Sequence, residues 1–439
     1  ASGEAADFFA LGVMELASGM VEPALAAWRR TIAHEPRHPH ASHTLALTLA
    51  KAERFEEART VLEIAEAHFP GDPFFPRLLA DAHAGLGRTD LARADYARAL
   101  ALAPNDGRSW FLAGLIDRDQ GRYADALECF TCAVALEPGF AAAHVDLAQM
   151  RLLQGDFAGG WPEWEWRDSN NWRGRPFSLT PPRRLRVVAE QGHGDTIQVC
   201  RYLPLLAARG FEVTLLCHDA LAGLMRTLPG VARVAGFDDP PEPGVDEIGL
   251  LSLPLYFETR LDDIPGPCPT LTAPERPVAG WVRRGAAGGP AVGLVWAGNP
   301  EHRNDRNRSC PLPALEPLRA VAGVAFHSLQ VGPAAADTPW LTDLAPAIAD
   351  FSDTAAAILA LDLVIAVDTA AAHLAGALGK PVWLLLPHVP DWRWLLHRSD
   401  SPWYPSMTLF RQPAPGDWTS CLERVAAALA HWKPPPRAP

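Results

Sequence analysis

The clearest fold signal in the sequence is LDLVIAVDTAAAHLAGALGKPVWLLLP, residues 361–387. Its first apolar run, Leu361–Val367, is short and contains several β-branched residues, which predicts a buried strand. Alanine-rich sequence of high helix propensity follows at Ala370–Leu378, and Gly379 ends the expected helix. A second apolar run, Val382–Leu386, predicts another buried strand. The order strand, turn, helix, strand is typical of a parallel α/β sheet.

The turn between the first strand and the helix is the first candidate site. Asp368 and Thr369 stand there, and both residue types favour helix-capping positions. Ligands of parallel sheets bind at the carboxyl ends of the strands, and the free N–H groups of a helix N-terminus favour phosphate. The sequence therefore predicts an anion site at Asp368, Thr369 and Ala370, with His373 one turn further along. An ordinary capped helix without a ligand is the alternative.

Length and composition limit the classes of protein to consider. The chain has 439 residues, enough for two to four domains, and its 48% hydrophobic and 21% charged residues are typical of a soluble globular protein. The net charge of −12 argues against a general nucleic-acid binder. No apolar run is long enough to span a membrane, and we expect no signal peptide. Seven scattered cysteines indicate a reducing compartment, so a cytoplasmic location is expected.

The first third of the chain repeats itself every 34 residues. Proline recurs at Pro36, Pro70, Pro104 and Pro138, and alanine recurs at Ala24, Ala58, Ala92 and Ala126. A third column, in which glycine predominates, reads Gly19, Glu53, Gly87, Gly121 and Gly155. This period, with small residues where helices cross, resembles the tetratricopeptide repeat. The resemblance implies an N-terminal helical solenoid over residues 1–168, in which the tryptophan-rich segment Trp161–Arg167 caps the array and docks it onto the next domain.

The phase of the repeats predicts which side chains face the concave groove of such an array. They include the aromatic and arginine residues Phe74, Arg77, Arg108, Phe111 and Arg118. Aromatic and arginine side chains together make good contact anchors, so we expect the groove to recruit a protein or glycan acceptor. A solvated face without a partner is the alternative.

Two α/β domains are predicted in the rest of the chain, at residues 183–280 and 290–430, after a polar linker at Asn170–Pro182. In the first domain, Leu185–Ala189 and Glu212–Cys217 predict strands.

Between these two strands lies a glycine loop, Gln191-Gly-His-Gly-Asp195, followed by an expected helix at Thr196–Arg209. The loop lacks the third glycine of a dinucleotide-binding fingerprint, because Ile197 stands in its place. Asp195 has two interpretations. It is either a helix cap or a carboxylate placed for acid–base chemistry.

In the second α/β domain, Val292–Trp296 and Val324–Leu329 predict strands, and Leu312–Val321 between them predicts a helix. Four polar residues follow these strands or lie in the charged loop between them: Asn299, Arg306, Arg308 and Gln330. Arginine forks suit phosphate oxygens, so the loop is expected to face a phosphate group, although a solvated loop is the alternative.

The turn at Asp368, Thr369 and Ala370, called the donor turn below, carries a more specific resemblance. The stretch VIAVDTAAAHLAGALGKPV is similar to the donor-site signature of glycosyltransferase family 9, the ADP-heptose heptosyltransferases. Asp368, Thr369 and His373 match that pattern, and Ala370 stands where the family has glycine. The loop that ends at Asp195 resembles the same family's Leu-Gly-Asp loop. The resemblance implies the GT-B architecture, two Rossmann-like α/β domains that face a cleft. The layout of repeats and α/β domains is also similar to that of the O-linked N-acetylglucosamine transferases.

The resemblance implies an inverting transfer from a nucleotide-diphosphate sugar, with Asp195 as the base that deprotonates the acceptor. Arg306 or Arg308 takes the place of the family's lysine and faces the diphosphate, and Asn299 and Gln330 touch the nucleotide. No Asp-x-Asp motif stands at a strand end, so neither a metal nor another cofactor is expected. The candidate acceptor-side and loop residues are Gln191, His193, Gly194, Asp391 and Trp392.

Two other functions fit the same sequence. In the first alternative, the C-terminal half is catalytically degenerate, and the repeats serve as a scaffold or adaptor for protein–protein interaction. In the second, the α/β region is a sugar-nucleotide epimerase, because the same architecture serves that reaction.

Overall fold

The computed structural model describes residues 2–38, 40–167, 184–266, 270–274, 276, 282, 284–302, 304–332 and 338–435. The chain divides into two compact units, Ala1–Met150 and Arg151–Pro439. The predicted linker Asn170–Pro182 lies outside the described residues.

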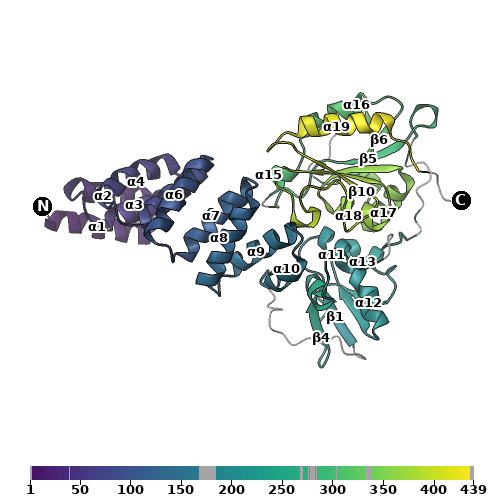
Figure 1. Ribbon diagram of the computed structural model, residues 1–439, viewed down its shortest axis with the longest axis horizontal. Coiled ribbons are helices and arrows are strands. Elements are labelled where there is room, and N and C mark those ends of the chain that lie inside the picture. The colour runs from purple at the N-terminus through teal and green to yellow at the C-terminus, as the bar shows by residue number, and fades with distance from the viewer. Residues whose placement is uncertain are drawn as a thin grey trace. The chain divides into compact units, whose positions relative to one another are not determined.

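The first unit consists of helices. They are α1 (Ser2–Ala17), α2 (Val21–His34), α3 (Ala41–Lys51), α4 (Phe55–His68), α5 (Phe74–Gly85), α6 (Thr89–Leu102), α7 (Gly107–Asp119), α8 (Tyr123–Leu136) and α9 (Ala141–Leu153), which runs past the unit boundary. Figure 1 shows them stacked as successive helix pairs. Each member of the predicted alanine column has no exposed surface, because the helices cross at these residues.

The column that separates the two helices of a pair has one backbone conformation throughout. Gly19, Gly87, Gly121 and Gly155 have φ values of 79°, 71°, 72° and 85°, and Glu53, the non-glycine member, has a φ of 57°. A residue in this left-handed region ends the first helix of each pair, and only glycine adopts it without strain.

The second unit contains two sheets of parallel strands. The four-stranded sheet has the order β3-β2-β1-β4, built from β1 (Arg184–Val188), β2 (Glu212–Leu216), β3 (Val231–Ala235) and β4 (Asp246–Gly249). The six-stranded sheet has the order β10-β9-β8-β5-β6-β7, built from β5 (Ala291–Val295), β6 (Ala325–Ser328), β7 (Leu341–Asp343), β8 (Leu363–Val367), β9 (Val382–Leu386) and β10 (Met407–Arg411).

Helices connect and cover these strands. They are α10 (Phe157–Trp164), α11 (His193–Val199), α12 (Leu203–Ala208), α13 (Asp219–Met225), α14 (Leu253–Tyr256), α15 (Asp305–Arg308), α16 (Glu316–Arg319), α17 (Phe351–Ala360), α18 (Ala370–Ala377) and α19 (Trp418–His431). In Figure 1, α16 and α19 lie on one side of the six-stranded sheet, and α17 and α18 lie on the other.

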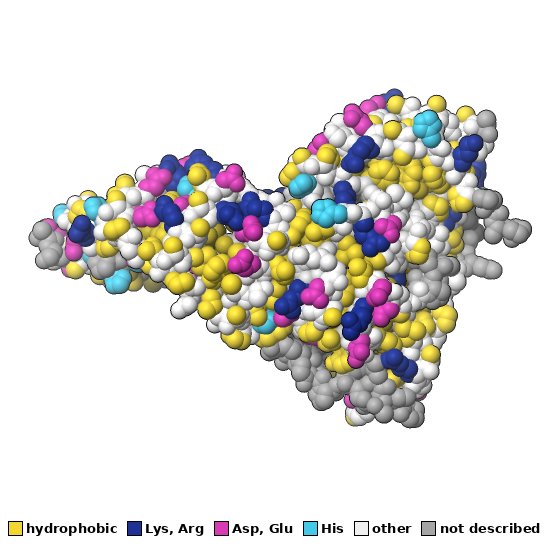
Figure 2. Space-filling view, viewed as in Figure 1, with side chains coloured by type: hydrophobic (Ala, Val, Ile, Leu, Met, Phe, Trp, Pro, Cys, Tyr) yellow, Lys and Arg dark blue, Asp and Glu magenta, His cyan; other side chains and the backbone are white. Residues whose placement is uncertain are grey.

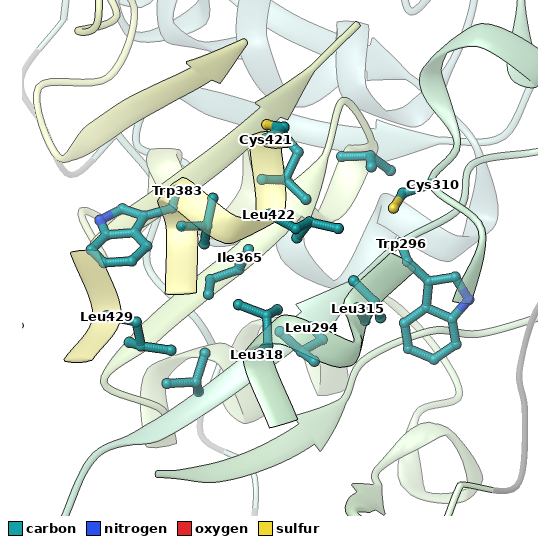
Figure 3. Packing of buried hydrophobic residues seen from close by; sticks show 14 of the residues in the cluster. Leu294, Trp296, Cys310, Leu315, Leu318, Ile365, Trp383, Cys421, Leu422 and Leu429 are labelled. Atoms are coloured by element: carbon teal, nitrogen blue, oxygen red, sulfur yellow. The ribbon is translucent and has the colours of Figure 1, made fainter. Parts of the chain in front are cut away.

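The core of the six-stranded sheet forms under α16 and α19. Leu294 and Ile365 of β5 and β8 pack against Leu318 of α16 and Leu422 of α19, and each is at most 1% exposed. Figure 3 shows these side chains converging between the sheet and the two helices. Burying one such side chain contributes about 1.5–3 kcal/mol.

Two predicted helices differ from the structure, and proline explains both differences. The helix expected at Thr196–Arg209 begins earlier, at His193, and is divided into α11, a 3₁₀ turn at Cys200–Tyr202 and α12. Pro204 lacks the N–H that a continuous helix would need there. One helix was likewise expected at Leu312–Val321, but Pro313 and Pro317 each start a new short piece, the 3₁₀ turn Leu312–Leu315 and then α16.

Strand order identifies where ligands of each sheet should bind. Successive strands β1, β2 and β3 extend the first sheet in one direction, whereas β4 pairs on the opposite side of β1. In the second sheet, β5, β6 and β7 extend one way, whereas β8, β9 and β10 extend the other. The order therefore reverses between β1 and β4 and between β5 and β8, and parallel sheets bind ligands beside such reversals, at the carboxyl ends of the strands.

The sequence predicted no apolar run long enough to span a membrane. None of the helices in the described part of the chain is both long enough and apolar enough to cross a bilayer.

Candidate functional site

The predicted donor turn leaves β8 at the strand-order reversal of the second sheet. Thr369 precedes α18 in an extended conformation, with a φ of −145°. Its hydroxyl donates to the carbonyl of Val367 at 3.1 Å, and no side chain caps the helix. Thr369 therefore occupies the N-cap position, as predicted, but neither its side chain nor that of Asp368 makes a capping hydrogen bond, since both bond elsewhere. The N–H groups of the first turn, which begins at Ala370, have no side-chain cap.

Asp368 is the most electrostatically perturbed carboxyl group of the turn. Its Oδ2 accepts a hydrogen bond from Trp394 Nε1 at 2.9 Å. Burial and the nearby Asp391 carboxylate raise its pKa to about 6, although Trp394 and Arg393 act in the opposite direction. Such a carboxyl group exchanges its proton close to neutral pH, which is a property of functional sites.

His373 lies in the second turn of α18 and is only 4% exposed. Its Nδ1 is hydrogen-bonded to the hydroxyl of Tyr404 at 3.0 Å, and its Nε2 lies 3.7 Å from Asp368 Oδ1. Burial lowers its pKa well below the usual value, and Arg393 and Arg201 add to that effect. The imidazole is therefore neutral, and it supports the turn through its contacts with Tyr404 and Asp368.

The charged loop after β5 reaches the same turn through one of its two candidate arginines. Arg308 Nη1 donates to the carbonyl of Asp368 at 3.3 Å, and its Nε lies 3.3 Å from Asp305. Arg306, on the same helical turn, is exposed. Asn299 is also exposed, and its Oδ1 accepts from the N–H of Glu301 at 3.1 Å. Of these candidates, Arg308 is the one that contacts the donor turn.

Gln330 has a different role from the predicted one. It is 4% exposed, and its Oε1 accepts from the N–H groups of Trp296 and Ala297 at 3.1 and 2.9 Å. Its Nε2 donates to the carbonyl of Val331 at 3.3 Å. Because its oxygen accepts twice and its nitrogen donates once inside the protein, Gln330 fixes the turn after β5.

The glycine loop leaves β1 at the strand-order reversal of the first sheet. Gln191 is exposed, and its φ of 60° is a conformation that a side chain other than glycine adopts only under strain. Asp195 is the third residue of α11 and is not the cap. Its Oδ2 accepts from the N–H of Gly192 at 2.8 Å, and its Oδ1 is paired with Arg393.

The two loops meet at Gly194. A Cβ atom on Gly194 would lie 2.9 Å from His373 Cδ2 and 3.5 Å from the Cα of Ala370, so glycine permits the close approach of α11 to α18. His193 is half-buried, with its ring 5.0 Å from that of Phe351, the first residue of α17. Burial and the neighbouring His218 lower the pKa of His193.

Arg393 connects the two α/β halves of the second unit. Its Nε donates to Gln198 Oε1 of α11 at 2.6 Å, its Nη1 donates to Asp391 Oδ1 at 2.8 Å, and its Nη2 is paired with Asp195. The guanidinium carbon also lies 4.4 Å from the ring centroid of Trp392. The carboxylates that surround it raise its pKa against the opposing effect of burial.

Trp392, one of the predicted acceptor-side and loop residues, is 4% exposed. Its ring centroid lies 5.5 and 5.8 Å from those of Trp161 and Trp164 of α10, and 6.0 Å from that of Trp403. These aromatic rings cover one another, so Trp392 packs the tryptophan-rich segment of α10 against the turn after β9.

The predicted groove residues lie in the first unit. The Phe74 ring lies 3.9 Å from that of His43 and 5.3 Å from the guanidinium of Arg77. Arg108 is exposed. Figure 2 shows basic and acidic side chains intermingled over the repeat helices.

Further along the repeats, the Phe111 and Phe140 rings lie 4.8 Å apart, and Arg118 pairs with Asp146 at 2.5 Å. Successive first helices thus carry arginines paired with carboxylates next to aromatic rings.

Four residues outside the set of predicted candidates support the site. Arg393, Gln198, Trp394 and Tyr404 hold the carboxylates and His373 in place. The pattern Asp391-x-Arg393 just past a strand end was a usable signal, because polar residues at strand ends meet at one edge of a sheet. Nothing in the local sequence marks Gln198.

The described residues contain no group of three or more His, Cys, Asp or Glu side chains that could hold a metal ion.

Comparison with known proteins identifies the first unit. A family model described as the tetratricopeptide repeat matches residues 9–73, 77–116 and 111–164. Residues 9–164 form a tetratricopeptide-repeat region. The predicted solenoid is thus confirmed, and its last matched segment includes α10.

Two curated proteins are similar to this chain. Protein FlbA of Caulobacter vibrioides is 28% identical over 467 residues, which cover 94% of this chain and 77% of FlbA. The tetratricopeptide repeat and J domain-containing co-chaperone DNJ1 of Fusarium oxysporum f. sp. lycopersici is 32% identical over 100 residues, 22% of this chain and 19% of DNJ1. The similarity to FlbA therefore extends through both units.

Two solved structures are similar to part of the chain. MamA from Desulfovibrio magneticus is 22% identical, with 31% of this chain and 77% of that chain covered and a TM-score of 0.29. A tetratricopeptide repeat protein from Parabacteroides merdae is 16% identical, with 39% and 68% covered and a TM-score of 0.35. These scores are low, and the repeat assignment rests on the family match and the 34-residue period.

Proposed function

We propose that the second unit is a glycosyltransferase of GT-B type that moves a sugar from a nucleotide-activated donor, without a metal and with inversion. The observation that carries the proposal is the meeting of two strand-end loops. Gly194 of one loop packs on Ala370 and His373 of the other, and Asp195 pairs with Arg393. Each loop leaves its sheet at a reversal of strand order, where parallel sheets bind ligands.

The donor's phosphate is assigned to the start of α18. The helix has no side-chain cap there, so its first N–H groups can donate to phosphate oxygens. Arg308, which already contacts the carbonyl of Asp368, supplies a cation at the same turn. Charge grows on the leaving phosphate as the sugar departs, and fixed donors and cations stabilise it. Asp368 is anionic or protonated, and it binds a hydroxyl group or orients the turn.

The acceptor is assigned to the repeat array. Tetratricopeptide arrays present extended concave surfaces to partners, and the arginine and aromatic side chains of α5 and α7 supply contact anchors there. We propose that a protein or a glycan bound by these residues is the acceptor.

A screen of nucleotide sugars tests the proposal directly. The whole chain is mixed with nucleotide-activated sugars that carry uridine, guanosine, adenosine or cytidine. Binding is measured by thermal shift, and transfer of the sugar is measured afterwards. We expect one class to raise the melting temperature. Arg308→Ala should weaken donor affinity about tenfold or more, because a charge-assisted hydrogen bond is worth about 1.5–3 kcal/mol. Arg319→Ala, an exposed arginine of α16, is the matched control.

Two outcomes would contradict the assignment. If no nucleotide sugar binds, the second unit is not a glycosyltransferase. If the product keeps the anomeric configuration of the donor, the inverting mechanism fails while the transferase stands.

A repeat-based adaptor is the second candidate, and two observations favour it. Asp195, the predicted base, has both oxygens in hydrogen bonds, and Trp392 has no free face. An adaptor predicts that Arg77→Ala and Arg108→Ala abolish binding of a partner protein in a chain that never binds a nucleotide sugar. Retained nucleotide-sugar binding by the wild type would reject it.

A further inference from the structure

We infer that Asp391, in the turn after β9, is the base of the transfer reaction, and that Asp195 and Arg393 position it. This inference rests on the proposed function and changes the residue to which the proton goes. It follows from how three carboxyl groups, Asp195, Asp368 and Asp391, are arranged around one buried arginine.

The first argument concerns which carboxylate oxygen is open. Asp195 uses Oδ2 for the N–H of Gly192 and Oδ1 for Arg393, and its side chain is 19% exposed. Asp391 uses Oδ1 for the N–H and Nη1 of Arg393, and its side chain is 36% exposed. Within the described part of the chain, no group donates to Asp391 Oδ2. An acceptor hydroxyl therefore has a free oxygen to approach at Asp391 but not at Asp195.

The second argument concerns rigidity. Arg393 is 8% exposed and makes contacts in four directions, to Asp195, Asp391, Gln198 and the ring of Trp392. A planar guanidinium held in this way fixes the direction of Asp391 Oδ2. Such support by neighbouring side chains is what a reactive group needs to be kept in a productive orientation.

The backbone on both sides of this contact is strained. Gln191 has a φ of 60° and Leu395 a φ of 51°, and the two residues flank the Asp195–Arg393 pair in the sequence. Non-glycine residues keep such conformations only where the surroundings enforce them, and they concentrate at functional sites. The strained backbone therefore indicates that the surrounding fold enforces this ion pair.

The third argument is location. β9 pairs with β8, so the turn that carries Asp391 lies at the same edge of the sheet as the donor turn. Asp391 is close enough to Asp368 to raise its pKa, and close enough to His302 of the charged loop to affect that group as well. The open carboxylate thus lies near both the donor turn and the loop after β5.

The reaction step balances with these groups alone. The acceptor oxygen forms a bond to the anomeric carbon of the sugar, and the bond from that carbon to the phosphate oxygen breaks. The acceptor proton passes to Asp391 Oδ2, and the electron pair of the broken bond leaves with the nucleotide phosphate. Arg393 pairs with Asp391 before the transfer, and once Asp391 has taken up the proton, Asp195 balances the charge of Arg393.

The experiment compares Asp391→Asn, Asp195→Asn and Asp400→Asn in the full chain, with the donor found in the screen. Asp391→Asn should lower kcat by about a hundredfold or more while the donor KM stays within about twofold, because it removes only the base. Asp195→Asn keeps one of the two acceptor oxygens and removes no base, so its kcat should fall less than tenfold. Asp400 is 68% exposed and pairs with Arg398, which makes it the matched control.

A second measurement separates a chemical role from a structural one. Formate should restore part of the turnover of Asp391→Ala, since a small carboxylate can occupy the vacated space, and it should not restore Asp195→Ala. Near-normal kcat in Asp391→Asn overturns the inference, as does a loss that formate cannot restore. A wild-type chain that transfers no sugar removes the proposed function and this inference with it, whereas an active wild type beside an active Asp391→Asn removes the inference alone.

Discussion

Both units of this protein carry exposed ion pairs, but among the described residues an arginine is buried together with its carboxylate partner only in the second unit. On the repeats, ion pairs such as Arg29–Glu57 join side chains that are 44% and 46% exposed. In the second unit, Arg167 and Glu190 pair at 2% and 8% exposure, and Arg393 and Asp195 at 8% and 19%. Exposed pairs contribute about 0–1 kcal/mol, whereas breaking a buried pair costs about 3–5 kcal/mol.

The difference shows where each unit obtains its structure. The repeats depend on local pattern, that is, on buried alanines where helices cross and on a left-handed residue where each first helix ends. The second unit depends in addition on polar contacts between residues far apart in the sequence. Four experiments can break or sharpen this contrast.

The largest effect is expected at Arg393. Arg393→Ala leaves Asp195 buried without its cation, so the free energy of unfolding should fall by about 3–5 kcal/mol. Arg398→Ala, which breaks an exposed pair in the same half, should cost no more than about 1 kcal/mol. Chemical unfolding of the full chain, followed by tryptophan fluorescence, measures both. Equal losses would remove the distinction between buried and exposed pairs.

Trp161 should have a comparable effect, because α10 folds as part of the second unit. Its indole is 3% exposed, and its Nε1 donates to the carbonyl of Thr259 at 2.8 Å. Trp161→Ala should lower stability by about 3–5 kcal/mol, the usual cost of removing a buried aromatic side chain. Phe237→Ala, at a 47% exposed position of the same unit, should change it by less than about 1 kcal/mol. A neutral Trp161→Ala would mean that the tryptophan-rich segment belongs to the repeats alone.

The third effect depends on pH and comes from Asp368. Its folded pKa of about 6 exceeds the unfolded value of about 3.9, so the folded state binds the proton more tightly. Stability should therefore fall as pH rises from 4 to 6, by about 1–3 kcal/mol, and remain at the lower level above pH 6. Asp391, Arg393, Arg308, Trp394 and His373 surround this carboxyl group. Asp368→Asn should flatten this part of the pH profile, and an unchanged slope would assign it to another group.

The smallest effect is expected in the repeats, and it tests whether local backbone conformation limits their stability. Glu53 adopts a φ of 57° where the other members of its column are glycine. Glu53→Gly should raise the free energy of unfolding of the first unit by about 1 kcal/mol, since it relieves the left-handed strain. Glu53→Ala removes the same carboxylate but keeps the Cβ, so it should give no such gain. A gain from both substitutions would point to charge instead of backbone conformation.

Much of the fold could be predicted because its signals are local. The period of 34 residues located the repeats, and apolar runs located β8 and β9, the latter at its observed bounds Val382–Leu386. The strands β7 and β10 and the helices α13, α14, α15 and α19 were missed. Strand β7 has only three residues, too few for a periodic pattern to emerge.

Sequence alone determined the repeat array, the parallel α/β character of the rest and the two loops that carry the candidate site. Periodicity and strand-end polarity are properties of neighbouring residues, so they survive without knowledge of the fold. Only the tertiary structure decided what each candidate does: that Gln330 holds a turn, that Trp392 is buried, and that Asp195 pairs with Arg393, 198 residues further along the chain. The packing of two sheets and their helices determines which distant residues become partners, and no local sequence pattern predicts them.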